Sequence, residues 1–107
     1  DKEKDYLFTL TKSEILWERR IAIVATWYFI KNNTLDTTFE IAKLLLNDKH
    51  DLMYKAVGWM LREAGKKDAK QLIDFLDRYT LQMPRIAVRY AIERLPQEVY
   101  KKYLLKN

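Results

Sequence analysis

Cysteine is absent from this chain of 107 residues, which also has only two glycines, two prolines, one histidine and one serine. The chain therefore forms neither disulfides nor zinc–thiolate sites, and it has no glycine-rich phosphate loop. Ser13 and His50, each the only one of its kind, leave little for nucleophilic catalysis, and no His, Asp or Glu cluster has metal-ligand spacing. We expect a binding surface with no metal, no cofactor and no catalytic centre of its own.

Long hydrophobic runs are also missing. The longest uncharged stretch, residues 21–30, is about half the length that a bilayer span requires. We therefore expect no membrane insertion and predict that residues 21–30 form an inner helix enclosed by its neighbours, because they are apolar on nearly every side. The lack of cysteine fits a reducing compartment, and we expect a cytoplasmic protein.

What the chain does contain favours helix throughout. Leucine, isoleucine, alanine, lysine, arginine and glutamate are abundant, and no segment alternates as a strand does. Ser13, Asp51 and Asp68 are suitable helix caps, Gly65 is suited to a helix end, and Pro84 and Pro96 suit first turns. These signals predict about seven helices in one all-α domain spanning residues 1–107, namely 2–10, 13–31, one from 36 or 37 to 46, 51–65, 68–79, one from 84 and one from 96.

A short motif recurs along the chain. Trp17 and Arg20 are echoed by Trp59 and Arg62, with the two tryptophans 42 residues apart. Helical repeats of two or three helices recur at about 40–47 residues. The echo therefore predicts stacked helical layers that present an aromatic residue and a cation at equivalent places.

Positive charge is concentrated near the end of the chain. The net charge is +5, and residues 84–107 contain six basic side chains against two acidic ones. Arg85 and Arg89 share one helix face. This distribution indicates an anionic partner, most often nucleic acid, or else a solvated face with surplus lysine.

The helix predicted at 51–65 has two contrasting faces. Its apolar face contains Leu52, Ala56, Val57, Met60, Leu61 and Ala64, and the opposite face contains Lys55, Trp59, Arg62 and Lys66. Trp59 either packs against an adjacent layer or is an exposed aromatic on a basic surface, which is the reading we favour. Arg20 and Arg62 either contact phosphate or form salt bridges, for example with Glu18, Glu63 or Glu93.

Three segments carry a family resemblance. LWERRIAIVATWYFIKN (16–32), LLLNDKHDLMYKAVGWMLREAGKKD (44–68) and MPRIAVRYAIERLP (83–96) resemble the C-terminal half of the DNA alkylation repair family, the HEAT-like alkylpurine DNA glycosylases of the D type. The resemblance implies an α-solenoid with a basic concave face that holds double-stranded DNA, and excision of N3- and N7-alkylated purines. It implies that Trp59 forms a wall of the lesion site and that Arg20 and Arg62 contact DNA. Lys55, Lys66, Arg85 and Arg89 complete the expected DNA-binding set.

The chain departs from the family in one respect. The family's catalytic aspartate lies in a W-D-x-V-D type segment upstream of WxRR, and no such segment is present here; Asp5 lacks the neighbouring tryptophan and valine. We therefore expect the C-terminal part of a longer enzyme, which binds DNA without hydrolysing the N-glycosyl bond.

Two further expectations follow. An unpaired layer edge at Tyr6, Leu7, Phe8 and Leu10 predicts self-association. The alternative function is a non-catalytic helical-repeat module that binds protein or nucleic acid.

Overall fold

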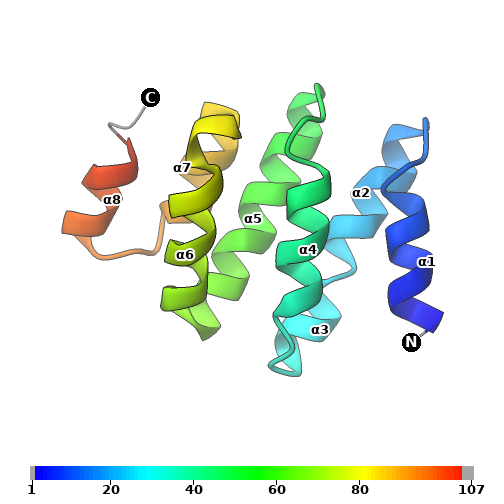
Figure 1. Ribbon diagram of the computed structural model, residues 1–107, viewed down its shortest axis with the longest axis horizontal. Helices are drawn as coiled ribbons and strands as arrows, with labels where there is room; N and C mark the ends of the chain where they lie inside the picture. Colours follow the sequence, from blue (N-terminus) through cyan, green and yellow to red (C-terminus); the bar gives the residue numbers. More distant parts are fainter. Residues whose placement is uncertain (1, 105–107) are drawn as a thin grey trace.

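Every regular element of the computed structural model, which describes residues 2–104, is a helix (Figure 1). The expected order is confirmed, with the second predicted helix divided in two. None of these helices is both long and apolar enough to cross a bilayer. The elements are α1 (Lys2–Leu10), α2 (Leu16–Val24), α3 (Trp27–Lys31), α4 (Asp36–Leu44), α5 (Asp51–Lys67), α6 (Ala69–Tyr79), the 3₁₀ turn η1 (Thr80–Gln82), α7 (Arg85–Ile92) and α8 (Gln97–Leu104).

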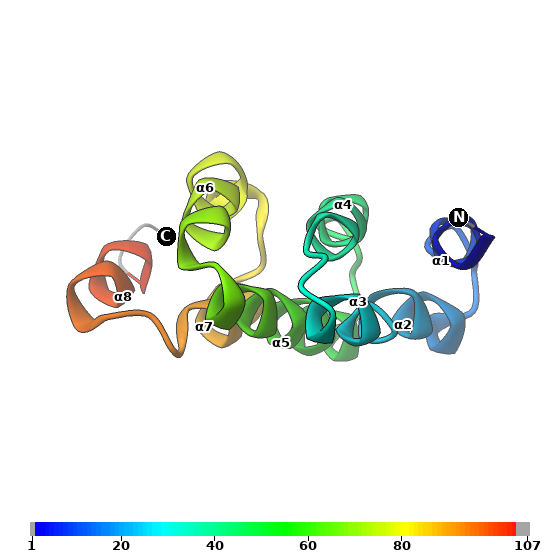
Figure 2. The same cartoon turned by 90° about the horizontal axis from the view of Figure 1, so that it is seen from below.

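The helices form two layers (Figure 2). One layer contains α1, α4 and α6, and the other contains α2, α3, α5 and α7, while α8 lies at the C-terminal end. From α3 to α7 the consecutive α-helices alternate between the two layers, and α4 and α6 run in the same direction (Figures 1 and 2). The central helix α5 packs against α2, α4, α6 and α7.

The core is built around the predicted apolar face of α5. Ala56, Val57, Met60, Leu61 and Ala64 are all buried, and they meet buried residues of the neighbouring helices. Leu52 was expected on this buried face but is 47% exposed. It lies in the first turn of α5, where it lines a surface pocket instead.

The predicted helix over 13–31 is broken at Ala25 and Thr26. The buried Thr26 hydroxyl donates to the Ile23 carbonyl at 2.6 Å, a side-chain bond that competes with the helical hydrogen-bond pattern. The prediction of an enclosed inner helix is wrong, because Trp27 and Tyr28 are 45% and 59% exposed. Aromatic and aliphatic composition alone did not distinguish core from apolar surface.

Two predicted caps are also wrong. His50, and not Asp51, caps α5: its Nδ1 accepts from the Leu52 amide at 3.2 Å. Ser13 lies in the turn before α2, where its Oγ accepts from the Ile15 amide at 3.0 Å, and Ile15 occupies the N-cap position.

Gly65 does not end its helix. It is buried inside α5, which continues to Lys67, and it has no positive φ. A Cβ at this position would lie 2.4 Å from Cδ2 of Leu72, so the missing side chain makes room for α6. Asp68 caps α6 as predicted, with Oδ1 accepting from the Gln71 amide at 3.2 Å.

Candidate nucleic-acid interface

A pocket of about 280 Å³ lies where α2, α5 and α7 meet. It is lined by four of the predicted site residues, Arg20, Lys55, Trp59 and Arg62. Arg20 comes from α2 and the other three from α5, so the fold unites residues of the two echoed segments. We call this cavity, which is completed by Leu52, Ala56 and Tyr90, the Trp59 pocket.

Tyr90 was missed by the sequence reasoning. It projects from α7, is 37% exposed, and provides a second aromatic side chain beside Trp59, which is 36% exposed. Gly58 explains its position: a Cβ there would lie 2.6 Å from both the Ala87 carbonyl oxygen and the Tyr90 Cβ. The available signal was Gly58, next to Trp59, because a glycine inside a helix leaves room for close approach of another element.

Arg20 and Lys55 supply positive charge to the Trp59 pocket. Neither forms an ion pair with any residue of the range 2–104, and the Arg20 guanidinium lies 5.4 Å from the Trp17 ring centroid. The cation–π contact leaves the guanidinium edges available to donate hydrogen bonds. In the first Trp–Arg pair the half-buried Arg20 therefore lies over the exposed ring of Trp17.

The second Trp–Arg pair, Trp59 and Arg62, is arranged differently. Arg62 Nη1 contacts Glu93 Oε2 at 2.7 Å, and its Nε lies 3.6 Å from Glu63 Oε2. The same Nε is buried and has no hydrogen-bond partner within the described residues. Two carboxylates thus offset the charge of Arg62, which is the salt-bridge alternative that the sequence left open.

The remaining predicted cations lie outside the Trp59 pocket. Lys66 pairs with Glu63 at 3.1 Å and lines an adjacent cavity of about 300 Å³ with Arg94. Arg85 donates from Nη2 to the Leu104 carbonyl at 2.6 Å, so it ties α7 to α8. Arg89 is exposed on α7.

No nucleophilic pair is assembled from the single serine and histidine. Ser13 Oγ donates to Glu18 Oε1 at 2.6 Å, and His50 Nδ1 is used to cap α5. Within residues 2–104, no three His, Asp or Glu side chains lie together as metal ligands would. Arginine and lysine beside exposed aromatic rings are groups of the kind that bind phosphates and stack on bases.

The fold and this surface define an all-helical protein with a cationic, aromatic pocket between its helices. The family model for the DNA alkylation repair enzyme matches residues 1–95, and the chain belongs to that family. Comparison with curated proteins and with solved structures gives no significant match.

Proposed function

We propose that this chain is the C-terminal, HEAT-like part of a DNA glycosylase that excises N3- and N7-alkylated purines. The main support is the Trp59 pocket, which joins Arg20 and Lys55 to an exposed indole. Membership of the DNA alkylation repair family supports DNA as the substrate. Three successive two-layer units support a solenoid repeat (Figure 2): α1 with α2 and α3, then α4 with α5, then α6 with α7.

Each group of the pocket has a task suited to its chemistry. Arg20 and Lys55 bind the DNA backbone, since neither has an ion-pair partner in the described part of the chain, residues 2–104. Trp59 provides one wall of the lesion site, because an indole face attracts the cationic ring of an N-alkylated purine. The carboxylates around Arg62 lower the local positive charge, which reduces repulsion of that cation.

In this proposal the chain does not supply the carboxylate that the reaction requires. An oxocarbenium-like sugar is stabilised by a nearby negative charge. The family's catalytic aspartate lies in a W-D-x-V-D type segment, and this sequence contains no such segment. We therefore expect the isolated chain to bind duplex DNA without base excision.

The test is binding to a labelled duplex over a salt series. A single-indole variant, with Trp17 and Trp27 replaced by phenylalanine, reports on Trp59 alone. We expect its fluorescence to be quenched by DNA. We expect Arg20→Ala and Lys55→Ala each to reduce the steepness of log K against log salt by about 1.

Lys67→Ala is the matched control, because Lys67 is an exposed cation at the end of α5 outside the Trp59 pocket. An equal loss in this control would show a diffuse charge effect and would contradict the assignment. Binding of an acidic peptide in place of DNA, with no response of Trp59, would favour the alternative of a non-catalytic helical-repeat module.

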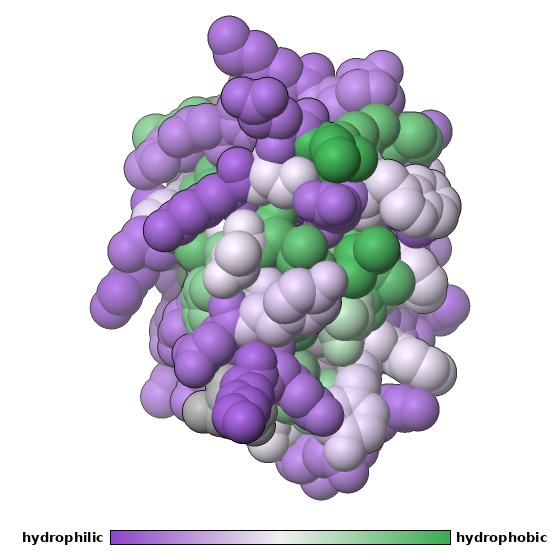
Figure 3. All heavy atoms as spheres, turned by 90° about the vertical axis from the view of Figure 1, so that its right-hand side faces the viewer, coloured by the Kyte–Doolittle hydropathy of each residue, from purple (hydrophilic) through white to green (hydrophobic). Residues whose placement is uncertain are grey.

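Self-association through the α1 end of the stack is the second part of the proposal. Leu7 and Leu10, expected at this edge, are buried, whereas Tyr6, Ile21 and Tyr28 are 62%, 41% and 59% exposed. The last three line a largely apolar cavity of about 480 Å³. Figure 3 shows hydrophobic side chains gathered at the centre of this end face, with hydrophilic ones around them.

A patch of this kind favours contact with a second copy, in which each end face covers the other. Sedimentation of the chain over a concentration series is expected to show a dimer, and Tyr28→Lys is expected to give a monomer. A wild-type chain that remains monomeric at millimolar concentration would refute this contact.

A further inference from the structure

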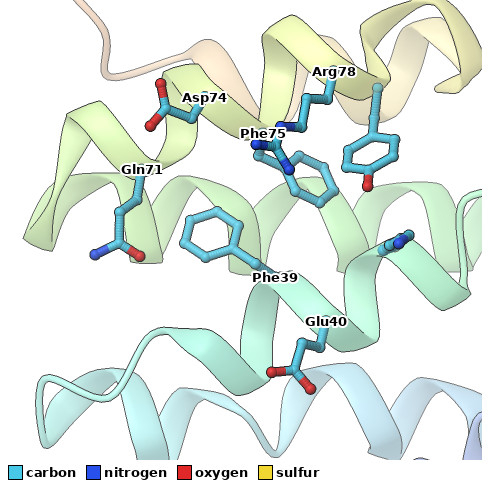
Figure 4. A pocket seen from close by; sticks show the side chains of 8 residues that line it. Phe39, Glu40, Gln71, Asp74, Phe75 and Arg78 are labelled. Atoms are coloured by element: carbon cyan, nitrogen blue, oxygen red, sulfur yellow. The ribbon is translucent and has the colours of Figure 1, made fainter.

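A second recognition site lies in the other layer, between α4 and α6 (Figure 4). The groove has a volume of about 310 Å³ and is lined only by residues of these two helices. Both helices pack on one side of α5, which belongs to the other layer and carries Trp59 of the Trp59 pocket. A ligand in this groove therefore does not compete for the proposed DNA surface. We call the cavity between these two helices the α4–α6 groove.

The groove has an aromatic lining. The ring centroids of Phe39 and Phe75, one from each helix, are 5.5 Å apart, and those of Phe75 and Tyr79 are 4.8 Å apart. Phe75 is buried, whereas Phe39 and Tyr79 are half-buried and present part of their rings to solvent. A continuous aromatic surface between two helices is suited to an apolar side chain that enters from solvent.

Four charged side chains also line the groove. On each helix an acidic residue precedes a basic one, Glu40 before Lys43 on α4 and Asp74 before Arg78 on α6. Pairs at these spacings can form ion pairs along a helix, yet none of the four has an ion-pair partner within residues 2–104. The charges are therefore available to a ligand.

The charged groups lie differently against the rings. On α6 the Asp74 carboxylate points away from the rings, whereas the Arg78 guanidinium reaches over Phe75, and the Glu40 carboxylate points away from both on the α4 side (Figure 4). The Lys43 ammonium lies 5.7 Å from the Tyr79 ring centroid, so this cation is next to the aromatic lining. Two carboxylates in the groove repel a run of phosphates, which disfavours a nucleic acid here.

We propose that the α4–α6 groove binds a short peptide segment of a partner protein, with an apolar side chain between a basic and an acidic residue. The apolar side chain packs on the three rings. The acidic residue pairs with Arg78, whose guanidinium lies over Phe75, and the basic residue pairs with Asp74 on the same helix (Figure 4). The partner is thereby held on the layer opposite the DNA surface.

The test is an amide NMR titration of the full chain with the peptide acetyl-Lys-Phe-Leu-Asp-amide. We expect saturable shifts in α4 and α6 with a dissociation constant on the order of 1 mM, a typical weak affinity. The control peptide acetyl-Lys-Gly-Gly-Asp-amide has the same charges without the apolar side chains, and we expect no saturation with it. Saturation by both peptides alike would contradict the apolar contact.

Arg78→Glu tests the charge contact without disturbing the core, because Arg78 is exposed. We expect it to weaken peptide binding at least about threefold, as loss of one exposed ion pair does. Arg89→Glu makes the same charge change on α7 and is expected to leave the affinity unchanged. Equal affinity of the wild type and Arg78→Glu, or shifts centred on the Trp59 pocket, would overturn the proposal.

Addition of duplex DNA separates this proposal from the glycosylase assignment. We expect DNA to shift amides around Trp59 and to leave the peptide affinity unchanged. Peptide binding without any DNA binding would refute the proposed function alone. DNA shifts in α4 and α6 that displace the peptide would show that the groove takes nucleic acid, and the peptide proposal would fail.

Discussion

Gly58→Ala tests the packing that places Tyr90 beside Trp59. An alanine Cβ at residue 58 would lie 2.6 Å from the Ala87 carbonyl oxygen and 2.6 Å from the Tyr90 Cβ. Both contacts are far inside van der Waals separation, and neither atom lies at the flexible end of a side chain. The substitution therefore requires that α7 move away from α5.

The expected loss of stability is the balance of two terms. Overpacking of a tight contact costs about 1–3 kcal/mol, and a rigid backbone oxygen places this site near the upper limit. Alanine in place of a mid-helix glycine stabilises the helix by about 1 kcal/mol, because alanine has the higher helix propensity. The net decrease in the free energy of unfolding is about 2 kcal/mol, or roughly 8 °C in Tm for a chain of this size.

Urea unfolding and calorimetry measure this change, with Gly65→Ala as the matched control. The new Cβ at residue 65 would lie 2.4 Å from Cδ2 of Leu72, the end of a flexible side chain that turns away more readily than a backbone. We expect Gly65→Ala to change stability by about 1 kcal/mol or less, because alanine's propensity gain offsets the crowding. Equal stability of Gly58→Ala and wild type would refute the α5–α7 packing and with it the position of Tyr90.

Three further predictions concern charges and protons. Glu93→Gln removes the closest carboxylate from Arg62, so we expect duplex affinity to rise about two- to fivefold in a fluorescence titration; unchanged affinity would exclude a phosphate contact by Arg62. Arg19→Ala breaks a half-buried ion pair of 2.7 Å with the carboxylate of Asp48 and is expected to cost about 1–2 kcal/mol in urea unfolding, whereas Lys12→Ala should cost nothing measurable. Burial, and then its hydrogen bond to a carboxylate, raise the pKa of Tyr103 above its usual value of 10.0. Above pH 10 the unfolded chain therefore releases this proton first, so stability should fall as pH rises, and more steeply than in Tyr103→Phe; parallel pH profiles would contradict the raised pKa.

Several features were predictable from the sequence because they depend on local chemistry. Asp68 caps α6, and Pro84 and Pro96 directly precede α7 and α8. The apolar face of α5 is buried from Ala56 to Ala64 because helical periodicity alone selects those positions. The same periodicity placed Lys55 and Trp59 together on the opposite face.

Other features depend on packing between helices. Gly65 has the local appearance of a helix end, but close approach of α6 determines its role. The run 21–30 has the composition of a buried helix, but Ile21 and Tyr28 are exposed and line the largely apolar cavity beside α1.

The sequence by itself determined the all-helical class, most helix boundaries and the family, and it pointed to candidate site residues, since each rests on periodicity, capping or motif. Only the tertiary structure decided which of those residues meet. Arg20 joins Trp59 because α2 packs on α5, Tyr90 joins them because Gly58 admits α7, and Glu93 offsets the charge of Arg62 from a different helix. Contacts between residues distant in the chain depend on how helix surfaces fit together, which no local pattern specifies.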